Sequence, residues 1–355
     1  MRTDSPGDYF AAAASHFRRS LYVSTMTHST ARLPRRLGTF AVAIAATITI
    51  AGCDAGVSEV LHTGTSSSTG AGGSSASASA SATGAGGSSA SASATTSGAG
   101  GAPAPLCKRG LGYGYNSVAD LKALSPGVSW WYNWAPQPDS AAVATTHAAL
   151  GIEFVPMAWN EKDLPKLAAE VPADAAYLLG FNEPNFGNQA NLTPEAAAAA
   201  WPQITKFAQD HNLATVSPAV NYCGSPCNET DPFVWLDKFF AACPGCKIDY
   251  IAMHWYACDK SALTWYLGQF EGKYDKPLWL TEFACLDDPG DHSAAGQSAY
   301  LSDALTILEN DPRVFRYAWF TGRNASSPAV DLLGADGQLT PLGQQYVTAP
   351  RACKP

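Results

Sequence analysis

Basic side chains are scarce in the part of the sequence that can form a core. Residues 106–355 contain 16 Lys and Arg against 26 Asp and Glu, which gives a net charge of −10. A nucleic-acid partner requires a basic surface that neutralises phosphates, so this composition argues against one. All ten tryptophans lie in the same range. An acidic, tryptophan-rich surface suits a neutral ligand that stacks on aromatic faces, as sugars do.

The apolar run near the N-terminus, residues 39–51, is too short to span a membrane, which takes ~20 residues. Three arginines precede it, which is the plan of a secretory signal, so residues 1–52 are interpreted as a signal region with Met26 as an alternative start. The run ends in Ile50-Ala51-Gly52-Cys53, which resembles a bacterial lipobox. This predicts an exported protein of the bacterial cell envelope, held to the membrane by a lipid on Cys53. An ordinary signal peptide with an incidental cysteine is the alternative.

Large apolar residues are missing from residues 64–101, which are almost entirely Gly, Ser, Ala and Thr. The block TGAGGSSASASA occurs at 69–80 and again at 83–94. Such a stretch cannot bury enough surface to offset the entropy of ordering. We therefore expect residues 53–105 to form a disordered tether between Cys53 and a folded domain at 106–355.

Short apolar runs alternate with amphipathic stretches across this domain. The amphipathic stretches include 194–211, 231–242, 261–274 and 293–310. Repeated strand-then-helix units predict parallel βα pairs, and eight units in about 250 residues match a single (β/α)₈ barrel of the α/β class. The eight predicted strands are 110–115, 128–134, 153–159, 176–181, 214–220, 249–256, 277–283 and 314–320.

A doubly wound sheet is the alternative fold. It usually carries a glycine-rich phosphate turn after its first strand, and here Gly112-Tyr113-Gly114 lacks the final glycine of that fingerprint. The dinucleotide-binding interpretation is therefore weak, and no organic cofactor is expected.

Eight cysteines remain once Cys53 is set aside, an even number that suggests disulfides in an exported chain. Cys107 and Cys353 bracket the domain and could tie its ends together. The pairs Cys223-x3-Cys227 and Cys243-x2-Cys246 could instead form a zinc site, although export removes the reducing environment that metal thiolates prefer. The remaining connectivity stays open at this point.

Two carboxylates end predicted strands that face each other across the barrel mouth. Glu183 follows the fourth strand and Glu282 lies at the end of the seventh. In a (β/α)₈ barrel the chemistry is located at the C-terminal ends of the strands. Hydrolysis of a glycosidic bond needs one carboxylic acid that protonates the leaving oxygen and one carboxylate on the other side of the bond. Without such roles, Glu183 would be a helix cap and Glu282 a member of a buried ion pair.

The motifs GFNEPN (180–185), HWYACD (254–259) and WLTEFAC (279–285) resemble glycoside hydrolase family 128 of clan A, and the resemblance spans about residues 108–350. It implies a retaining endo-β-1,3-glucanase without metal or organic cofactor. Its substrate would be the β-1,3-glucan of laminarin, curdlan or cell walls. We expect a monomer.

The resemblance also assigns roles residue by residue. Glu183 would be the general acid/base, Glu282 the nucleophile, and Asn182 a ligand of the sugar 2-hydroxyl. Tyr256 would donate a hydrogen bond to Glu282. His254 would line the site or support the acid, although a satisfied core histidine is its alternative interpretation.

Tryptophans would supply the sugar-binding faces. Trp319 would be the platform under the sugar at the cleavage point, with Trp131, Trp134, Trp159 and Trp255 as candidates for other subsites. Because strand residues alternate in direction, some of these must point elsewhere, and Trp159 and Trp319 are favoured. The family pattern also implies a disulfide between Cys258 and Cys285, beside the nucleophile.

Two other functions stay open. One is a clan A hydrolase of another β-glycan, such as mannan or β-1,4-glucan. The other is a catalytically silent β-glucan-binding protein on the same scaffold, against which the presence of both glutamates argues.

Overall fold

The computed structural model describes residues 106–354, and the signal region, Cys53 and the whole expected tether lie outside them. Eight strands, β2 to β9, run parallel to their neighbours. Six form one sheet in the order β4-β3-β2-β9-β8-β7, and β5 pairs with β6. Their bounds are Arg109–Gly112, Trp130–Tyr132, Glu153–Phe154, Tyr177–Leu179, Ala214–Val216, Ile251–Ala257, Leu278–Asp287 and Val314–Phe320.

Isolated parallel bridges join the two sheets into a ring. Met157 pairs with Leu179 between the β4 and β5 segments, and Val216 pairs with Tyr250 between the β6 and β7 segments. The eight strands therefore close into a barrel, and the predicted (β/α)₈ fold is confirmed.

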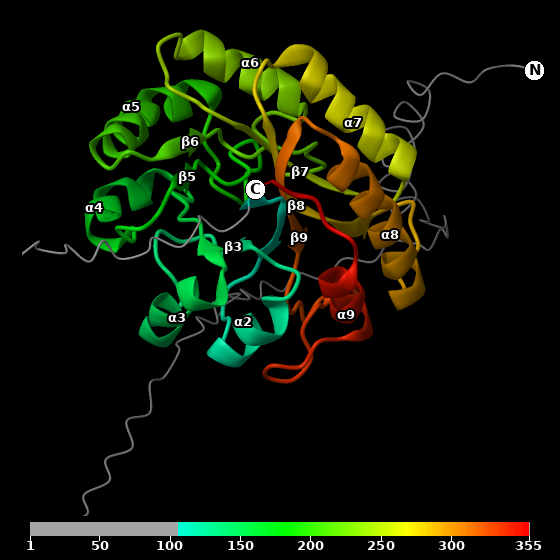
Figure 1. Cartoon of the computed structure of the whole chain (residues 1–355). Coiled ribbons are helices and arrows are strands. Elements are labelled where there is room, and N and C mark those ends of the chain that lie inside the picture. The colour runs from blue at the N-terminus through cyan, green and yellow to red at the C-terminus, as the bar shows by residue number, and fades with distance from the viewer. Residues whose placement is uncertain (1–105, 355) are drawn as a thin grey trace, which may run out of the picture. The chain divides into compact units, whose positions relative to one another are not determined.

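A helix follows each strand and packs outside the ring (Figure 1). The predicted helices are found to within about a residue at each end. Asp231 and Ser293, which begin two of the predicted stretches, cap the helices through hydrogen bonds from first-turn amides. The helices are α2 Val118–Leu124, α3 Ala141–Thr146, α4 Leu167–Glu170, α5 Pro194–Asp210, α6 Pro232–Ala242, α7 Lys260–Lys273, α8 Ala294–Asn310 and α9 Pro341–Thr348, with short 3₁₀ turns η1 Ala148–Leu150, η2 Glu161–Lys166 and η3 Pro328–Val330.

The barrel interior is filled by side chains, as in other barrels of this size. It includes Trp130, Tyr132, Met157 and Trp279, all at most 1% exposed. Nearer the N-terminal ends of the strands, the Arg316 guanidinium lies 4.9 Å from the Trp279 ring centre. A buried aromatic interior leaves the C-terminal rim as the place for polar groups.

Four disulfides are present among the described residues. Cys107–Cys353 joins the ends of the domain, where β1 (Leu106–Cys107) pairs with β10 (Cys353–Lys354), and Cys258–Cys285 joins β7 to β8. The two pairs considered for zinc, Cys223/Cys227 and Cys243/Cys246, are each bonded internally and so offer no thiolate ligands.

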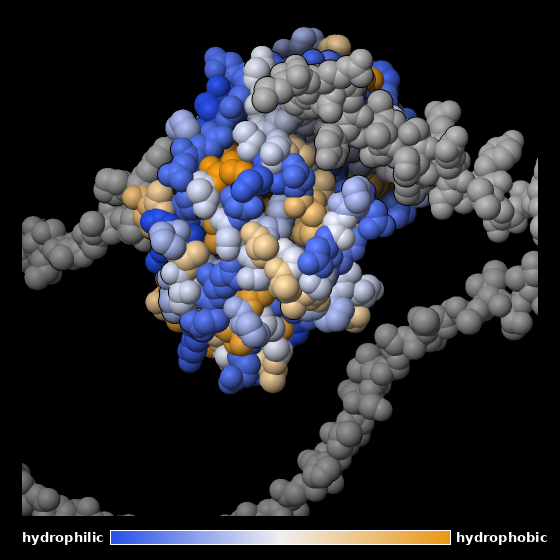
Figure 2. Space-filling model, turned by 90° about the vertical axis from the view of Figure 1, so that its right-hand side faces the viewer, coloured by the Kyte–Doolittle hydropathy of each residue, from blue (hydrophilic) through white to orange (hydrophobic). Residues whose placement is uncertain are grey.

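Few of the aromatic side chains of the described residues are exposed at the surface. The face seen in Figure 2 is mostly hydrophilic, with small separate hydrophobic patches. Tyr115, 87% exposed at the rim after β2, is the most exposed large hydrophobic side chain of residues 106–354. No helix in this range is both long and apolar enough to span a bilayer.

Candidate active site

Glu183 and Glu282 come from opposite sides of the barrel mouth. Glu183 lies four residues past β5, where its amide donates to the Ala219 carbonyl (2.8 Å). Its φ of +39° is in the left-handed region, which is uncommon for a residue other than glycine and typical of functional sites. Glu282 lies within β8, beside register shifts against both neighbouring strands. Such irregularities re-aim side chains next to active sites.

The two carboxylates meet over a buried histidine. Nδ1 of His254, which is 0% exposed, lies 2.9 Å from Oε1 of Glu183 and 3.5 Å from Oε2 of Glu282. One oxygen of each carboxylate and a ring nitrogen of His254 lie within 4.8 Å of one another. The residues Glu183 and Glu282 are 6% and 4% exposed, so both carboxylates are largely shielded from solvent.

Burial and charge act in opposite directions on His254. Burial lowers its pKa, but the charge of Glu282 and the hydrogen bond and charge of Glu183 outweigh burial, so the pKa lies above its ordinary value. A proton on His254 offsets part of the repulsion between the two neighbouring carboxylates.

Glu282 is surrounded by neutral donors. Tyr132 Oη and Trp134 Nε1 lie 2.9 and 2.8 Å from its Oε1, and the Tyr256 hydroxyl donates to its Oε2. Burial, and next the charge of Glu282, raise the pKa of both tyrosines well above the ordinary value. Both hydroxyls therefore keep their protons and stabilise an ionised Glu282. The expected Tyr256 contact is present, whereas no sequence pattern indicated Tyr132.

Asn182 offers a free acceptor beside Glu183. Its amide nitrogen donates to Gln189 Oε1 (3.2 Å), while its Oδ1 is buried and has no partner among the described residues. A buried carbonyl oxygen without a donor is costly, and a ligand hydroxyl would satisfy it. This arrangement suits the expected contact with a sugar.

Trp319 is not a sugar platform, which corrects the prediction made from the sequence. Its neighbour Ala318 points into the barrel, so Trp319 points outward between the strands and the helices. It is 0% exposed, its indole donates to the Val330 carbonyl (2.8 Å), and its ring packs against Phe283. The next residue, Phe320, is half-buried and packs against Tyr256, which donates a hydrogen bond to Glu282.

Trp131 and Trp255 are also misassigned, for the same reason of strand alternation. Trp131 is fully buried against His147 and Phe154, and Trp255 stacks on Tyr266 of α7 with ring centres 4.5 Å apart. Neither can offer a face to a sugar in the mouth.

Trp134 and Trp159 are the two predicted tryptophans that remain candidates for sugar contact. Both are half-buried and pack on the barrel interior cluster, on the side of the C-terminal rim. Trp159 is also linked to the segment that carries Glu183, because its backbone carbonyl accepts a hydrogen bond from the Asn182 backbone N–H (3.0 Å).

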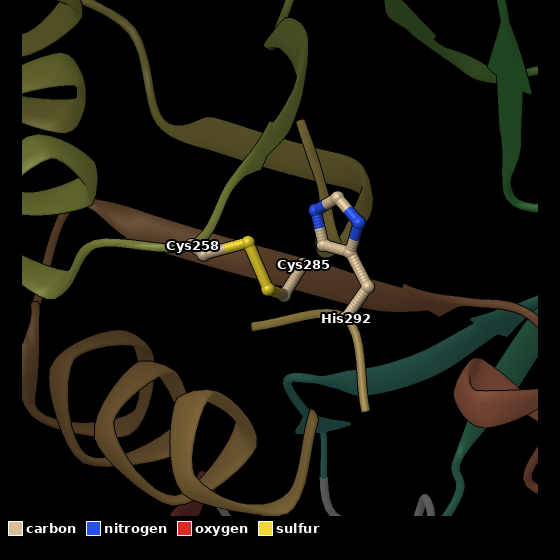
Figure 3. A group of neighbouring side chains, drawn as sticks. All are labelled: Cys258, Cys285 and His292. Carbon is tan, nitrogen blue, oxygen red and sulfur yellow. A yellow bond between two sulfur atoms is a disulfide. The ribbon is translucent and has the colours of Figure 1, made fainter. Parts of the chain in front are cut away.

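The Cys258–Cys285 bridge is attached to β8 three residues beyond Glu282. Figure 3 shows the bond beside the imidazole of His292. Two sulfurs and an imidazole are a zinc-like donor set, but sulfurs bonded to each other are not thiolate ligands. The bridge therefore acts as a fixed link between the ends of β7 and β8.

Glu183, His254 and Glu282 also have donor types that a divalent cation takes. The three neutral donors around Glu282 already occupy both of its oxygens. Hydrogen-bond donors favour a free carboxylate over a metal ligand there, so the arrangement fits acid/base and nucleophilic chemistry better.

Known proteins share this fold and sequence. The family described as "glycosyl hydrolase catalytic core" matches residues 110–346. Alkali-sensitive linkage protein 1 of Schizosaccharomyces pombe is 32% identical over 246 residues, which are 67% of this chain and 42% of that protein. The chain thus spans less than half of that relative's length.

Solved structures of glycoside hydrolase family 128 match over nearly their full length. A subgroup II endo-β-1,3-glucanase from Sorangium cellulosum is 49% identical and covers 69% of this chain and 99% of its own, with a TM-score of 0.65. A subgroup I endo-β-1,3-glucanase from Amycolatopsis mediterranei, in complex with laminaritriose, is 32% identical and covers 68% and 98%, with a TM-score of 0.56. With a closed (β/α)₈ barrel and two carboxylates at its mouth, the chain belongs to the glycosyl hydrolase catalytic core family, within it to glycoside hydrolase family 128, and is a glycoside hydrolase.

Proposed function

We propose that this glycoside hydrolase is a retaining endo-β-1,3-glucanase that acts on laminarin- and curdlan-type glucans. The carboxylate pair carries the proposal, because oxygens of Glu183 and Glu282 lie within 4.8 Å of each other. Retaining enzymes place their carboxyl groups ~5–5.5 Å apart, whereas inverting enzymes leave ~6.5–9.5 Å for a water molecule. The likeness to β-1,3-glucanases, one of them with laminaritriose bound, supports the choice of substrate.

The reaction would proceed in two displacements. Glu282, ionised among its donors, attacks the anomeric carbon while the glycosidic C–O bond breaks and the leaving oxygen takes the proton of Glu183. Glu183, now a carboxylate, removes a proton from a water molecule that attacks the same carbon and releases Glu282. Asn182 Oδ1 would accept a hydrogen bond from the sugar 2-hydroxyl, a contact that strengthens in the transition state.

The roles are tested by azide rescue of Glu183→Ala and Glu282→Ala with an aryl laminaribioside. Azide should restore turnover of E183A and give a β-glycosyl azide, because the covalent intermediate still forms. With E282A it should give the α-azide, because azide takes the place of the missing nucleophile. An α-azide from E183A, or unchanged laminarin hydrolysis by both variants, would refute the assignment.

A product profile tests the substrate. The wild type should release reducing ends from laminarin and curdlan and spare mannan and β-1,4-glucan. Faster cleavage of mannan or β-1,4-glucan would favour the other clan A activity, and binding without release of reducing ends would favour the silent protein.

We also propose that the chain is exported and anchored through a lipid on Cys53. The support is the arginine-flanked apolar run at 39–51 and the sequence Ile50-Ala51-Gly52-Cys53. The protein would then act on glucan outside the cell, as a monomer and without a cofactor.

A further inference from the structure

Trp134 makes a contact that a sugar platform does not need. Its indole Nε1 lies 2.8 Å from Oε1 of Glu282. An indole N–H donates one hydrogen bond, cannot accept one, and does not titrate in the working range of an enzyme. Glu282 therefore has a donor whose character is independent of pH.

The second donor to Oε1, the Tyr132 hydroxyl, has another acceptor nearby. Tyr132 Oη lies 2.9 Å from Oε1 of Glu282 but also 3.1 Å from the Thr281 carbonyl oxygen. A hydroxyl has one proton, which these two acceptors share. The Trp134 N–H also interacts with the Tyr132 hydroxyl, but unlike that hydroxyl it has no backbone carbonyl as a second acceptor.

The backbone at Trp134 adopts a strained conformation that directs the indole toward Glu282. Its φ of +59° lies in the left-handed region, a genuine outlier for a bulky side chain. The loop that follows is tied by its own hydrogen bonds, because Asn133 Nδ2 donates to the Gln137 carbonyl and to Asp139 Oδ1, both at 2.9 Å. Strain that the surroundings maintain at a site is an indication of function.

Ring packing fixes the orientation of the indole. Its ring centre lies 5.3 Å from that of Tyr132 and 5.9 Å from that of Phe320, edge-on in both cases. The side chain is nevertheless only half-buried. One side chain can therefore contact the nucleophile through its edge and a sugar through its face.

We propose that Trp134 is a positioning residue for Glu282, which rests on the proposed role of Glu282 as the nucleophile. The indole N–H holds Oε1 and keeps the carboxylate ionised and turned. Oε2 then lies on the Glu183 side, where His254 Nδ1 is 3.5 Å from it. In the first displacement Oε2 bonds to the anomeric carbon, and Oε1 becomes the ester carbonyl oxygen that still accepts from Trp134.

The test separates the indole N–H from the aromatic face. Trp134→Phe keeps a ring and removes the donor. Replacement of Trp134 by benzothienylalanine keeps the bicyclic shape as well, which covers the case in which the phenylalanine variant fails to fold. The matched control is Trp159→Phe, because Trp159 is likewise half-buried and packs on the same interior cluster.

Loss of the N–H should lower kcat on laminarihexaose about 10-fold or more, since hydrogen bonds to charged groups are among the stronger ones. KM should change less than about 3-fold, and the acidic limb of the kcat/KM profile should move to higher pH, because the ionised form of Glu282 has lost a donor. Trp159→Phe should raise KM and leave the acidic limb in place.

Carboxyl ¹³C NMR of glutamate-labelled protein gives a readout without substrate, with the Glu282 signal assigned from Glu282→Gln. Its titration should move to higher pH in both Trp134 variants. Unmoved titration and an unmoved acidic limb in an active enzyme would overturn the positioning role. A moved titration in a protein that hydrolyses no β-1,3-glucan would instead overturn the proposed function.

Discussion

Glu183 and Glu282 carry the same chemical group, and their neighbours make them different. Glu282 receives bonds from hydroxyl and indole donors that stay protonated, which favours its anion. Glu183 has the titratable His254 as its side-chain partner (2.9 Å), with which it can exchange a proton. A group that must give and take back a proton suits the second environment, which supports Glu183 as the acid/base.

His254 should make stability depend on pH. Its pKa is raised above 6.5 in the folded state, so the favourable charge interaction is fully present below 6.5 and is lost as pH rises through the folded value. The free energy of unfolding of wild type minus that of His254→Gln should therefore shrink from about pH 6 to about pH 9, as measured by urea denaturation. His211→Gln, at an exposed histidine, is the control; a gap that stays flat or widens would contradict the ion-pairing of His254.

Trp319 and Trp159 should respond in opposite ways to truncation. Trp319→Ala should cost about 3–5 kcal/mol of unfolding free energy, because it empties a buried indole site. Trp159→Ala should raise KM for laminari-oligosaccharides and cost much less stability, because the side chain is only half-buried. Urea unfolding and steady-state kinetics measure both; a KM effect confined to Trp319→Ala would restore Trp319 as the platform.

At the scale of elements, β8 differs from the other strands. It runs for ten residues, Leu278–Asp287, and carries both Glu282 and the half-cystine Cys285. The buried Gln297 of α8 holds the same point, with Cys285 N–H donating to its Oε1 (3.2 Å) and its own amide donating to the Cys285 carbonyl (2.5 Å). The part of β8 beyond Glu282 is thus fixed by the disulfide on one side and by Gln297 on the other.

Removal of the Cys258–Cys285 bridge should affect stability and turnover together. The double variant Cys258→Ser/Cys285→Ser should lose about 2–4 kcal/mol of unfolding free energy. It should also lower kcat more than it raises KM, since the link fixes the strand that carries Glu282. Cys243→Ser/Cys246→Ser, whose bridge joins residues only three apart, is the matched control and should lose less of both. Equal losses in the two variants would show that the first bridge has no special role at the site.

At the scale of the whole molecule, a compact barrel follows a long segment of small residues. Cys107–Cys353 ties the two ends of the domain together, with a sequence separation of 246 residues. The carboxylate-bearing mouth is formed entirely within the described domain. If the proposed anchor at Cys53 exists, its loss should therefore leave catalysis intact.

The proposed lipid anchor at Cys53 can be tested separately from catalysis. In a bacterial host, wild type should incorporate radiolabelled palmitate and sediment with membranes, whereas Cys53→Ala should do neither and keep its laminarinase activity per molecule. Unlabelled, freely soluble wild type would favour the ordinary signal peptide.

The order of strands and helices, and two carboxylates at the barrel mouth, were determined by the sequence alone, although β8 continues to Asp287, well beyond the strand end expected at Glu282. Alternation of apolar runs with amphipathic stretches is local, and parallel strands bring their C-terminal ends to one rim. Glu183, Glu282, Asn182 and Tyr256 could therefore be selected from the sequence, with the help of the family motifs.

Only the tertiary structure decided which aromatic side chains reach the site. Direction along a strand reverses at every residue, so an uncertainty of one position exchanges Trp319 for Phe320, or Trp131 for Tyr132. The register shifts in β8 and the left-handed backbone at Trp134 also alter the direction in which nearby side chains point. Contacts such as Trp134 to Glu282 join residues 148 apart, and no local pattern encodes that distance.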